Sequence, residues 1–303
     1  MRAVIIVNRR ARALLAEGPL LRELSRPRDG VCSVETSSLD DLDRAVRELA
    51  EDPPDVVVLA GGDGSFMAGV TALARARALR RIALVPGGTV STIARDWGFQ
   101  GDPVKYTRCI LDAVAADSPP IVRRPTLRVN ERIGFICGAG LVARFFEVYE
   151  REGAPGYAGA AKIVARVFAG SFVRSAFARR ILDPAPCTIE VDGKRAPFDR
   201  VSLVCASVVR DLGLSMRLLY RAGEELDRFH VVATPLSATR LGPQLPLVLA
   251  GRPLVGRRVD TLARSLSLRF PPGAGAYVLD GELFRADVVD VTPGPVLDVV
   301  TPR

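Results

Sequence analysis

The stretch that decides the fold reads Val56-Val57-Val58-Leu59-Ala60-Gly61-Gly62-Asp63-Gly64-Ser65-Phe66-Met67. A short apolar run stops at two glycines, which are followed by a carboxylate, a third glycine and a hydroxyl, and a helix is expected over residues 68–80. Backbone N–H groups at the start of a helix favour anions, and glycines let a ligand approach the backbone. The stretch therefore predicts a strand, a turn and a helix, and the turn is either a phosphate site or an ordinary strand–helix connection.

A second glycine-rich turn follows the next apolar run, residues 81–85, and reads Pro86-Gly87-Gly88-Thr89. We expect a helix over residues 90–97, with Thr89 or Ser91 as its N-cap. In an open parallel sheet, such turns line up along the edge at which ligands bind. Neither turn fits a Walker A loop, because no Gly-Lys-Ser/Thr follows, and Met67 occupies the last glycine position of a G-x-G-x-x-G pattern.

The composition is that of a chain large enough for two domains, with 303 residues of which 48% are hydrophobic. Its net charge of +8 suits nucleotide phosphates or an anionic membrane surface. The sequence lacks a basic run with interleaved aromatic residues, which would indicate binding to nucleic acid. The five cysteines are scattered, which indicates reduced thiols and a cytoplasmic setting. The single histidine, His230, argues against a histidine-rich metal site, and no apolar run reaches the roughly 18 residues of a membrane-spanning helix.

The first part of the chain alternates strands with helices, which predicts a doubly wound parallel sheet. The expected strands are 3–7, 31–35, 56–60 and 81–85, and the expected helices are 13–24, 39–51, 68–80 and 107–116. Prolines 119, 120 and 125 mark a domain boundary. We therefore expect an α/β nucleotide-binding domain over residues 1–124, which residues 294–303 can complete.

After this boundary the pattern becomes mostly β, which predicts an antiparallel β-sandwich as the substrate domain, residues 125–293. The expected strands are 126–129, 132–137, 187–191, 201–208, 229–233, 265–270, 276–279, 288–291 and 296–300. One helical stretch, residues 160–182, interrupts them. It has Lys162, Arg166 and Arg174 on one face, an apolar stripe at positions 164, 168 and 172, and no acidic residue. Such a stretch is either a basic amphipathic helix that lies on an anionic membrane or an ordinary surface helix.

A third motif, Asp280-Gly281-Glu282, comes late in the chain. Taken alone, its first two residues could form a hairpin turn like Asp192-Gly193. With the two glycine-rich turns, however, it makes the chain resemble the diacylglycerol kinase and sphingosine kinase family of lipid kinases, and the soluble bacterial members in particular. The family pattern is GGDGT, then P-x-G-T-x-N-D-F-A-R, then DGE, and the resemblance covers essentially the whole chain.

The resemblance implies ATP bound between the two domains, with Mg²⁺, and a lipid substrate at the membrane surface, where the cytoplasmic protein would be peripheral. It leaves a homodimer open. The residues implied in nucleotide binding are Asn8, Thr36, Gly61, Gly62, Asp63, Gly64, Ser65, Phe66, Met67, Gly88 and Thr89. Glu282 is the implied catalytic carboxylate, with Asp280 and Asp63 nearby. The family's D-G-x-L-D magnesium segment corresponds to residues 224–230, where Asp227 is the candidate ligand.

The chain departs from the family pattern at three places. The N-P-x-S-G segment after the first strand is Asn8-Arg9-Arg10-Ala11-Arg12, Ser91-Thr92 replaces an Asn-Asp pair, and the magnesium segment matches poorly. These departures bear on nucleotide affinity and on the substrate more than on the fold.

The resulting prediction is an ATP-dependent lipid kinase that transfers the γ-phosphate to a primary hydroxyl of a diacylglycerol- or sphingoid-type lipid. Phosphoryl transfer needs positioning, charge neutralisation and a group that orients or deprotonates the hydroxyl. One alternative is an NAD kinase, which shares a GGDG turn but whose usual Asn-Glu dipeptide is not apparent here. The other is a non-catalytic lipid-binding relative.

Overall fold

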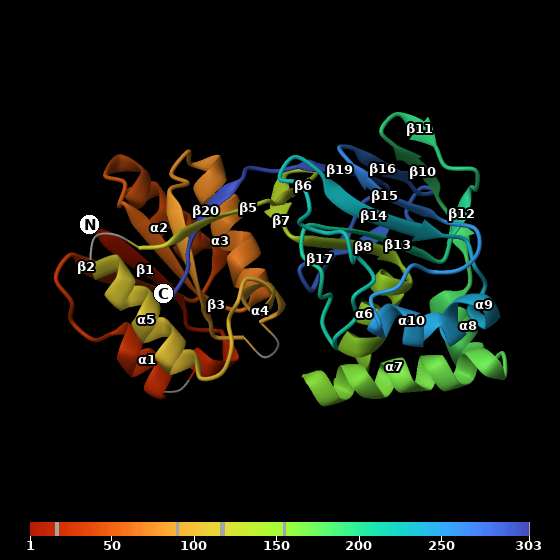
Figure 1. Ribbon diagram of the computed structural model, residues 1–303, viewed down its shortest axis with the longest axis horizontal. Helices are drawn as coiled ribbons and strands as arrows, with labels where there is room; N and C mark the ends of the chain where they lie inside the picture. Colours follow the sequence, from red (N-terminus) through yellow and green to blue (C-terminus); the bar gives the residue numbers. More distant parts are fainter. Residues whose placement is uncertain (16–17, 89–90, 116–118, 154–155, 303) are drawn as a thin grey trace. The chain divides into compact units, whose positions relative to one another are not determined.

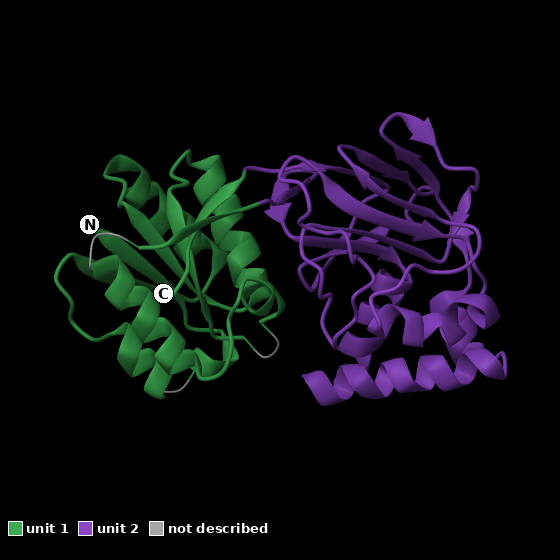
Figure 2. Cartoon of the chain, viewed as in Figure 1, with its two compact units in different colours: residues 1–124, 296–303 green, residues 125–295 purple. Residues whose placement is uncertain are grey.

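The computed structural model describes residues 1–15, 18–88, 91–115, 119–153 and 156–302. It separates into two compact units (Figure 2). The first unit consists of Met1–Arg124 and Val296–Arg303, and the second of Pro125–Pro295. The chain thus leaves the first unit once and returns to it with its last strand.

The first unit contains a six-stranded sheet in the order β2-β1-β3-β4-β20-β5 (Figure 1). Its strands are β1 (Ala3–Asn8), β2 (Val31–Thr36), β3 (Val56–Gly61), β4 (Arg81–Pro86), β5 (Ile121–Arg124) and β20 (Leu297–Val300). All neighbours pair in parallel except β5, which runs antiparallel to β20. The expected parallel sheet is confirmed, and its carboxyl-terminal edge carries both glycine-rich turns.

Helices cover both faces of this sheet. They are η1 (Arg12–Leu14), α1 (Pro19–Leu24), α2 (Leu39–Glu51), α3 (Asp63–Arg75), α4 (Thr92–Asp96) and α5 (Pro103–Ala115). One face packs alternate strand residues such as Ile5, Val58 and Val85 against α1 and α5. On the other face, Gly69 of α3 lies against Leu59 of β3. Burial on both faces explains why the central strands are continuous apolar runs.

Two helices differ from the sequence-based expectation. The stretch 13–24 is a short 3-10 turn followed by α1, which starts at Pro19. The helix after the first glycine turn starts at Asp63 rather than at residue 68, and it ends at Arg75. The glycine-rich turn is therefore itself the first turn of α3, which places its free N–H groups within the motif.

The second unit has two six-stranded antiparallel sheets and a two-stranded one. One sheet has the order β11-β10-β16-β19-β6-β7, the other the order β15-β14-β13-β8-β17-β18, and β12 pairs with β9. The bounds are β6 (Leu127–Val129), β7 (Arg132–Gly134), β8 (Ile136–Gly140), β9 (Ala185–Pro186), β10 (Thr188–Val191), β11 (Lys194–Arg195), β12 (Arg200–Val201), β13 (Leu203–Ser207), β14 (Phe229–Thr234), β15 (Val259–Ala263), β16 (Leu266–Arg269), β17 (Ala276–Leu279), β18 (Glu282–Arg285) and β19 (Val288–Pro293). The predicted fold class, a parallel α/β domain with a second domain of antiparallel sheets, is confirmed.

A helical layer, of which the sequence analysis anticipated only the stretch 160–182, covers the outer side of the sheet that contains β13 and β14 (Figure 1). It contains α6 (Leu141–Glu152), α7 (Tyr157–Phe172), α8 (Ala176–Leu182), α9 (Ala238–Leu241), η2 (Gly242–Gln244) and α10 (Leu245–Leu249). The stretch 160–182 is two helices rather than one, because Arg174 takes a positive φ of 52° between them. Arg174 therefore does not continue the helical face of Lys162 and Arg166.

Candidate functional site

The candidate site in the first unit lies at the carboxyl ends of its parallel strands. In the strand register, Asn8 at the end of β1 is level with Thr36 of β2, and Gly61 of β3 is level with Pro86 of β4. The direction of strand order reverses between β1 and β3, where open α/β sheets bind their ligands. The structure thus brings Asn8, Thr36 and both glycine turns to one edge.

A hydrogen bond crosses this reversal point. Asn8 Nδ2 donates to Ser65 Oγ at 2.7 Å, and the backbone N–H of Gly62 donates to the same oxygen at 3.3 Å. Asn8 is held in turn by the backbone N–H of Arg10, which donates to Asn8 Oδ1 at 2.9 Å. Because Ser65 Oγ accepts two hydrogen bonds, its own hydrogen remains available for an acceptor, and none is found among the described residues.

The two glycine turns touch backbone to backbone. Gly87 N donates to Gly61 O at 2.7 Å, and a Cβ added to Gly88 would lie 2.7 Å from the Cα of Gly62. No side chain fits such an approach, so glycine is required at this point. Beside this contact lies the half-buried first turn of α3. The N–H groups of Gly64 and Ser65 have no hydrogen-bond acceptor within the helix, because they lie in this first turn.

Asp63 joins the first turn to the helix after the second. Its Oδ2 accepts from Thr92 N at 2.8 Å and its Oδ1 from Ile93 N at 3.1 Å, so this carboxylate caps α4. Ser91, one of the two expected caps, has a φ of 52° and makes no capping bond. Burial raises the pKa of Asp63 above its ordinary value, and the two N–H donors oppose that shift. Because both of its carboxylate oxygens accept hydrogen bonds from α4, Asp63 holds the two glycine-rich turns in position.

Other expected nucleotide residues have different surroundings. Phe66 is fully buried and Met67 nearly so, so their side chains belong to the core and not to a phosphate cradle. The backbone N–H of Phe66 is also engaged, because it donates to Gly62 O at 3.0 Å. Thr36 is buried, with its hydroxyl 3.4 Å from Val7 O. Thr89 lies outside the described residues.

The third motif forms the tight hairpin between β17 and β18 in the second unit. Asp280 and Gly281 have φ values of 48° and 90°, the positive pair typical of a type I′ turn. The buried carboxylate of Asp280 accepts from Phe135 N at 3.1 Å and from Ile136 N at 2.8 Å. Asp280 therefore fastens the hairpin to β8, and these bonds occupy the carboxylate that the resemblance placed near the chemistry.

Glu282 is the contrasting carboxylate of this hairpin. It opens β18, and its exposed side chain makes no hydrogen bond or ion pair with the described residues. A carboxylate without a partner is free to accept a proton from a substrate hydroxyl. Of the three expected catalytic acids, only Glu282 has oxygens that no backbone group occupies.

The candidate metal ligand, Asp227, is engaged in an ion pair. Asp227 is exposed and paired with Arg264, whose Nε donates to Asp227 Oδ2 at 3.1 Å and lowers the pKa of this carboxyl. Among the residues that the structure describes, no three His, Cys, Asp or Glu side chains gather as metal ligands. The surroundings of Asp227 therefore do not fit a structural magnesium site.

The single histidine is engaged within the fold. His230 is fully buried, its Nδ1 accepts from Arg221 N at 3.3 Å, and its Nε2 lies 2.9 Å from Asp260 Oδ1. These contacts assign the proton to Nε2. Because both ring nitrogens are engaged within the protein, His230 is a structural residue.

Comparison with known proteins gives a family match within the first unit. Residues 2–118 match the family model for the diacylglycerol kinase catalytic domain. A solved structure of a diacylglycerol kinase from Bacillus anthracis str. Sterne superposes with a TM-score of 0.66 at 13% identity, covering 99% of this chain and 96% of that one. Another solved structure from that organism, provisionally named a diacylglycerol kinase, gives a TM-score of 0.70 at 14% identity, with coverages of 99% and 97%.

These structural matches establish a shared fold, and the family match adds the type of domain. No curated protein matches the chain. The resemblance to the diacylglycerol kinase-like lipid kinase family is confirmed, and residues 2–118 carry the match to the catalytic-domain model.

Proposed function

We propose that this chain, with its diacylglycerol kinase catalytic domain, is an ATP-dependent lipid kinase that transfers the γ-phosphate to a primary hydroxyl of a diacylglycerol- or sphingoid-type lipid. The observation that carries the proposal is the setting of Ser65. Its hydroxyl oxygen is fixed by Asn8 and Gly62, so its hydrogen is directed to an outside acceptor. It stands beside free N–H groups at a helix start, in a domain of this family.

The phosphates of ATP are the acceptors that suit this edge of the sheet. Gly62 and Gly88 keep side chains away from the backbone, and Ser65 together with the first N–H groups of α3 supplies hydrogen-bond donors. Asp63 keeps the two turns together by capping α4. Mg²⁺ that arrives with ATP would neutralise phosphate charge. We propose no resident metal site, because the described residues gather no ligand cluster.

We assign Glu282 as the base that accepts the proton of the lipid hydroxyl. It is exposed and without a partner, whereas the carboxylates of Asp63 and Asp280 are bound to backbone N–H groups. Removing the hydroxyl proton as the phosphoryl group moves makes the oxygen a better nucleophile. In this proposal Asp63 and Asp280 are positioning residues.

The proposed contact with the membrane is the outer face of α7 and the turn after it. Tyr157, Phe172 and Val173 are 53%, 59% and 76% exposed, and the exposed cations Lys162 and Arg174 lie among them. An exposed apolar face with basic residues suits the interface of an anionic bilayer. Within the described part of the chain, no helix has the length and apolar character needed to cross a bilayer.

A phosphorylation assay tests the proposed function. The protein is incubated with ATP and a lipid extract, and products are identified by mass spectrometry, with parallel reactions that contain NAD or no acceptor. We expect a phosphorylated diacylglycerol or sphingoid lipid. Phosphorylated NAD would favour the NAD kinase alternative. Lipid binding without ATP turnover would favour the non-catalytic relative, for which the pairing of Asp227 with Arg264 is the supporting observation.

Vesicle binding tests the membrane contact. Phe172→Ser with Val173→Ser removes two exposed apolar side chains, and we expect roughly tenfold weaker binding to vesicles that contain anionic lipid. Val288→Ser, at an exposed position on β19, is the matched control. Equal co-sedimentation of the double variant and this control would show that α7 is an ordinary surface helix.

A further inference from the structure

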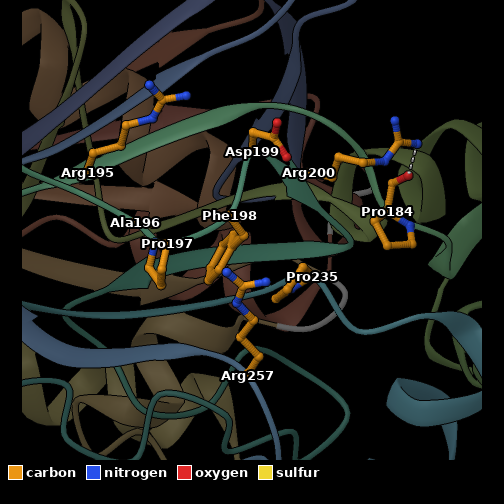
Figure 3. Close-up of a pocket in the computed structure, with 9 residues that line it drawn as sticks. All are labelled: Pro184, Arg195, Ala196, Pro197, Phe198, Asp199, Arg200, Pro235 and Arg257. Atoms are coloured by element: carbon orange, nitrogen blue, oxygen red, sulfur yellow. Dashed lines mark hydrogen bonds between the residues drawn. The ribbon is translucent and has the colours of Figure 1, made fainter.

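A hollow in the second unit lies away from the Asp280-Gly281-Glu282 hairpin. It has a volume of about 520 Å³ and is formed by residues 195–200, which run from the last residue of β11 to the first residue of β12, with Pro184, Pro235 and Arg257 (Figure 3). The β11 strand forms one edge of its sheet, and β12 belongs to the small two-stranded sheet. Neither pairs with β17 or β18, and both lie at the far end of the unit from β17 (Figure 1). The hollow is therefore separate from the proposed catalytic hairpin.

The charge around this hollow is unbalanced. Arg195, Arg200 and Arg257 line it, and Asp199 is the only acidic residue in the lining. In the described part of the chain, none of these three guanidinium groups forms an ion pair with a carboxylate. Each therefore keeps N–H donors that no protein anion satisfies.

Arg200 and Arg257 are held in place by uncharged groups, which do not compensate their positive charge. Arg200 Nη2 donates to the backbone oxygen of Pro184 at 2.8 Å, the dashed bond in Figure 3. The guanidinium of Arg257 lies over the Phe198 ring, 5.7 Å from its centroid. A carbonyl oxygen and an aromatic face orient a guanidinium without neutralising it. The arrangement presents oriented cations beside an apolar surface.

The backbone around these side chains is fixed by the fold. Thr234 Oγ1 donates to Arg257 O at 2.7 Å, and Cys187 N donates to Asp199 O at 2.9 Å. Phe198 is buried beneath the hollow. Because these anchors exist without a ligand, little ordering would be needed for binding.

We propose that this hollow binds a phosphate-bearing anion. Guanidinium groups bind phosphate through paired N–H donors, and the volume lies within the usual range for small-molecule sites. The apolar part of such a ligand would rest on Phe198 and Pro235. The phosphate is either that of a soluble compound or that of a lipid headgroup, and the proposal does not depend on the chain being a kinase.

Nuclear magnetic resonance of the arginine Nε–Hε groups tests the proposal without ATP. Inorganic phosphate is titrated into the full chain, and the signals of Arg200 and Arg257 are assigned by their loss in Arg200→Gln and Arg257→Gln. We expect both signals to shift, and the paired substitution to weaken this binding about tenfold or more. Arg128→Gln is the control, because Arg128 is an exposed arginine on β6, and three strands lie between β6 and β11 in the same sheet.

A second arm separates the two sources of phosphate. Vesicles of phosphatidylcholine with and without phosphatidic acid are sedimented with the wild type, the paired variant and the control. Weaker sedimentation of the paired variant only with phosphatidic acid assigns the hollow to a lipid headgroup, and loss of phosphate binding alone assigns it to a soluble compound. The proposal is overturned if the Arg200 and Arg257 signals do not move, or if Arg128→Gln loses as much binding as the paired variant.

Discussion

Two hairpins of the second unit have the same two-residue turn sequence, Asp-Gly. Asp192-Gly193 joins β10 to β11, and Asp280-Gly281 joins β17 to β18. The φ values are 47° and 73° in the first pair and 48° and 90° in the second. Both are therefore two-residue turns with positive φ at each position, as the right-handed twist of a hairpin requires.

The two aspartates also make the same contacts. Asp192 N donates to Ser265 O at 3.0 Å, and Asp192 Oδ1 accepts from Arg264 N and Ser265 N, both at 2.8 Å. Asp280 repeats the pattern: its N–H donates to Ile136 O at 3.0 Å, and its carboxylate accepts from the N–H groups of Ile136 and the residue before it. In both hairpins the aspartate fastens the turn to the neighbouring strand.

The hairpins differ in burial and in the residue that follows the glycine. Asp280 is 7% exposed whereas Asp192 is exposed, and the next residue is Glu282 in one hairpin and Lys194 in the other. The shared pattern shows that Asp-Gly is a strand-pairing device which the chain uses twice. Glu282 is therefore the residue that distinguishes the Asp280-Gly281-Glu282 motif chemically from the other hairpin.

The largest difference between the hairpins should appear in turnover. Glu282→Gln keeps size and polarity but removes basicity, so we expect lipid phosphorylation to fall by about 10²- to 10⁴-fold. Lys194→Gln, at the matched position, should leave it unchanged. Turnover is measured together with thermal melting. Wild-type turnover in a folded Glu282→Gln variant would make the two hairpins equivalent and remove Glu282 from the chemistry.

A smaller difference should appear in stability. Asp280→Ala removes the acceptor of the buried Phe135 N–H and of the partly buried Ile136 N–H, and we expect a loss of about 2–4 kcal/mol in the free energy of unfolding. Asp192→Ala should cost less than about 1 kcal/mol, because water can replace the exposed carboxylate. Urea unfolding measures both.

The variant Asp280→Asn sharpens this test. An asparagine tolerates positive φ and keeps one acceptor oxygen, so we expect it to recover most of the stability and most of the turnover. If Asp280→Asn is stable but inactive, Asp280 has a chemical role beyond its contacts with β8.

The smallest effect should be common to both hairpins. Gly281→Ala and Gly193→Ala each place a side chain at positive φ, which costs roughly 1–2 kcal/mol. An added Cβ would meet nothing within 4 Å at Gly193 and only Phe146, at 4.0 Å, at Gly281. Similar losses in urea unfolding would confirm that the turns are locally equivalent. A much larger loss at one of them would show that its surroundings constrain it further.

The sequence was informative where local pattern and burial agree. Val56–Gly61 is buried on both faces, so its apolar run predicted a central strand, and Ala276–Leu279 has the predicted bounds. The sequence was less informative where a single backbone angle decides where a helix begins or ends. A positive φ at Arg174 divides one expected helix into two, and a positive φ at Ser91 removes an expected cap. Most residue types adopt such angles rarely, so pattern alone does not reveal them.

By itself, the sequence determined the order of the three motifs, the parallel sheet that carries the first two, and the presence of acids at Asp63, Asp280 and Glu282. Only the tertiary structure decided which of these acids remains free. The N–H groups that engage Asp63 and Asp280 come from segments that begin 29 and 144 residues away in the chain. Strand pairing and the contact between two turns bring those donors into place, and a pattern of neighbouring residues does not encode such distant partners.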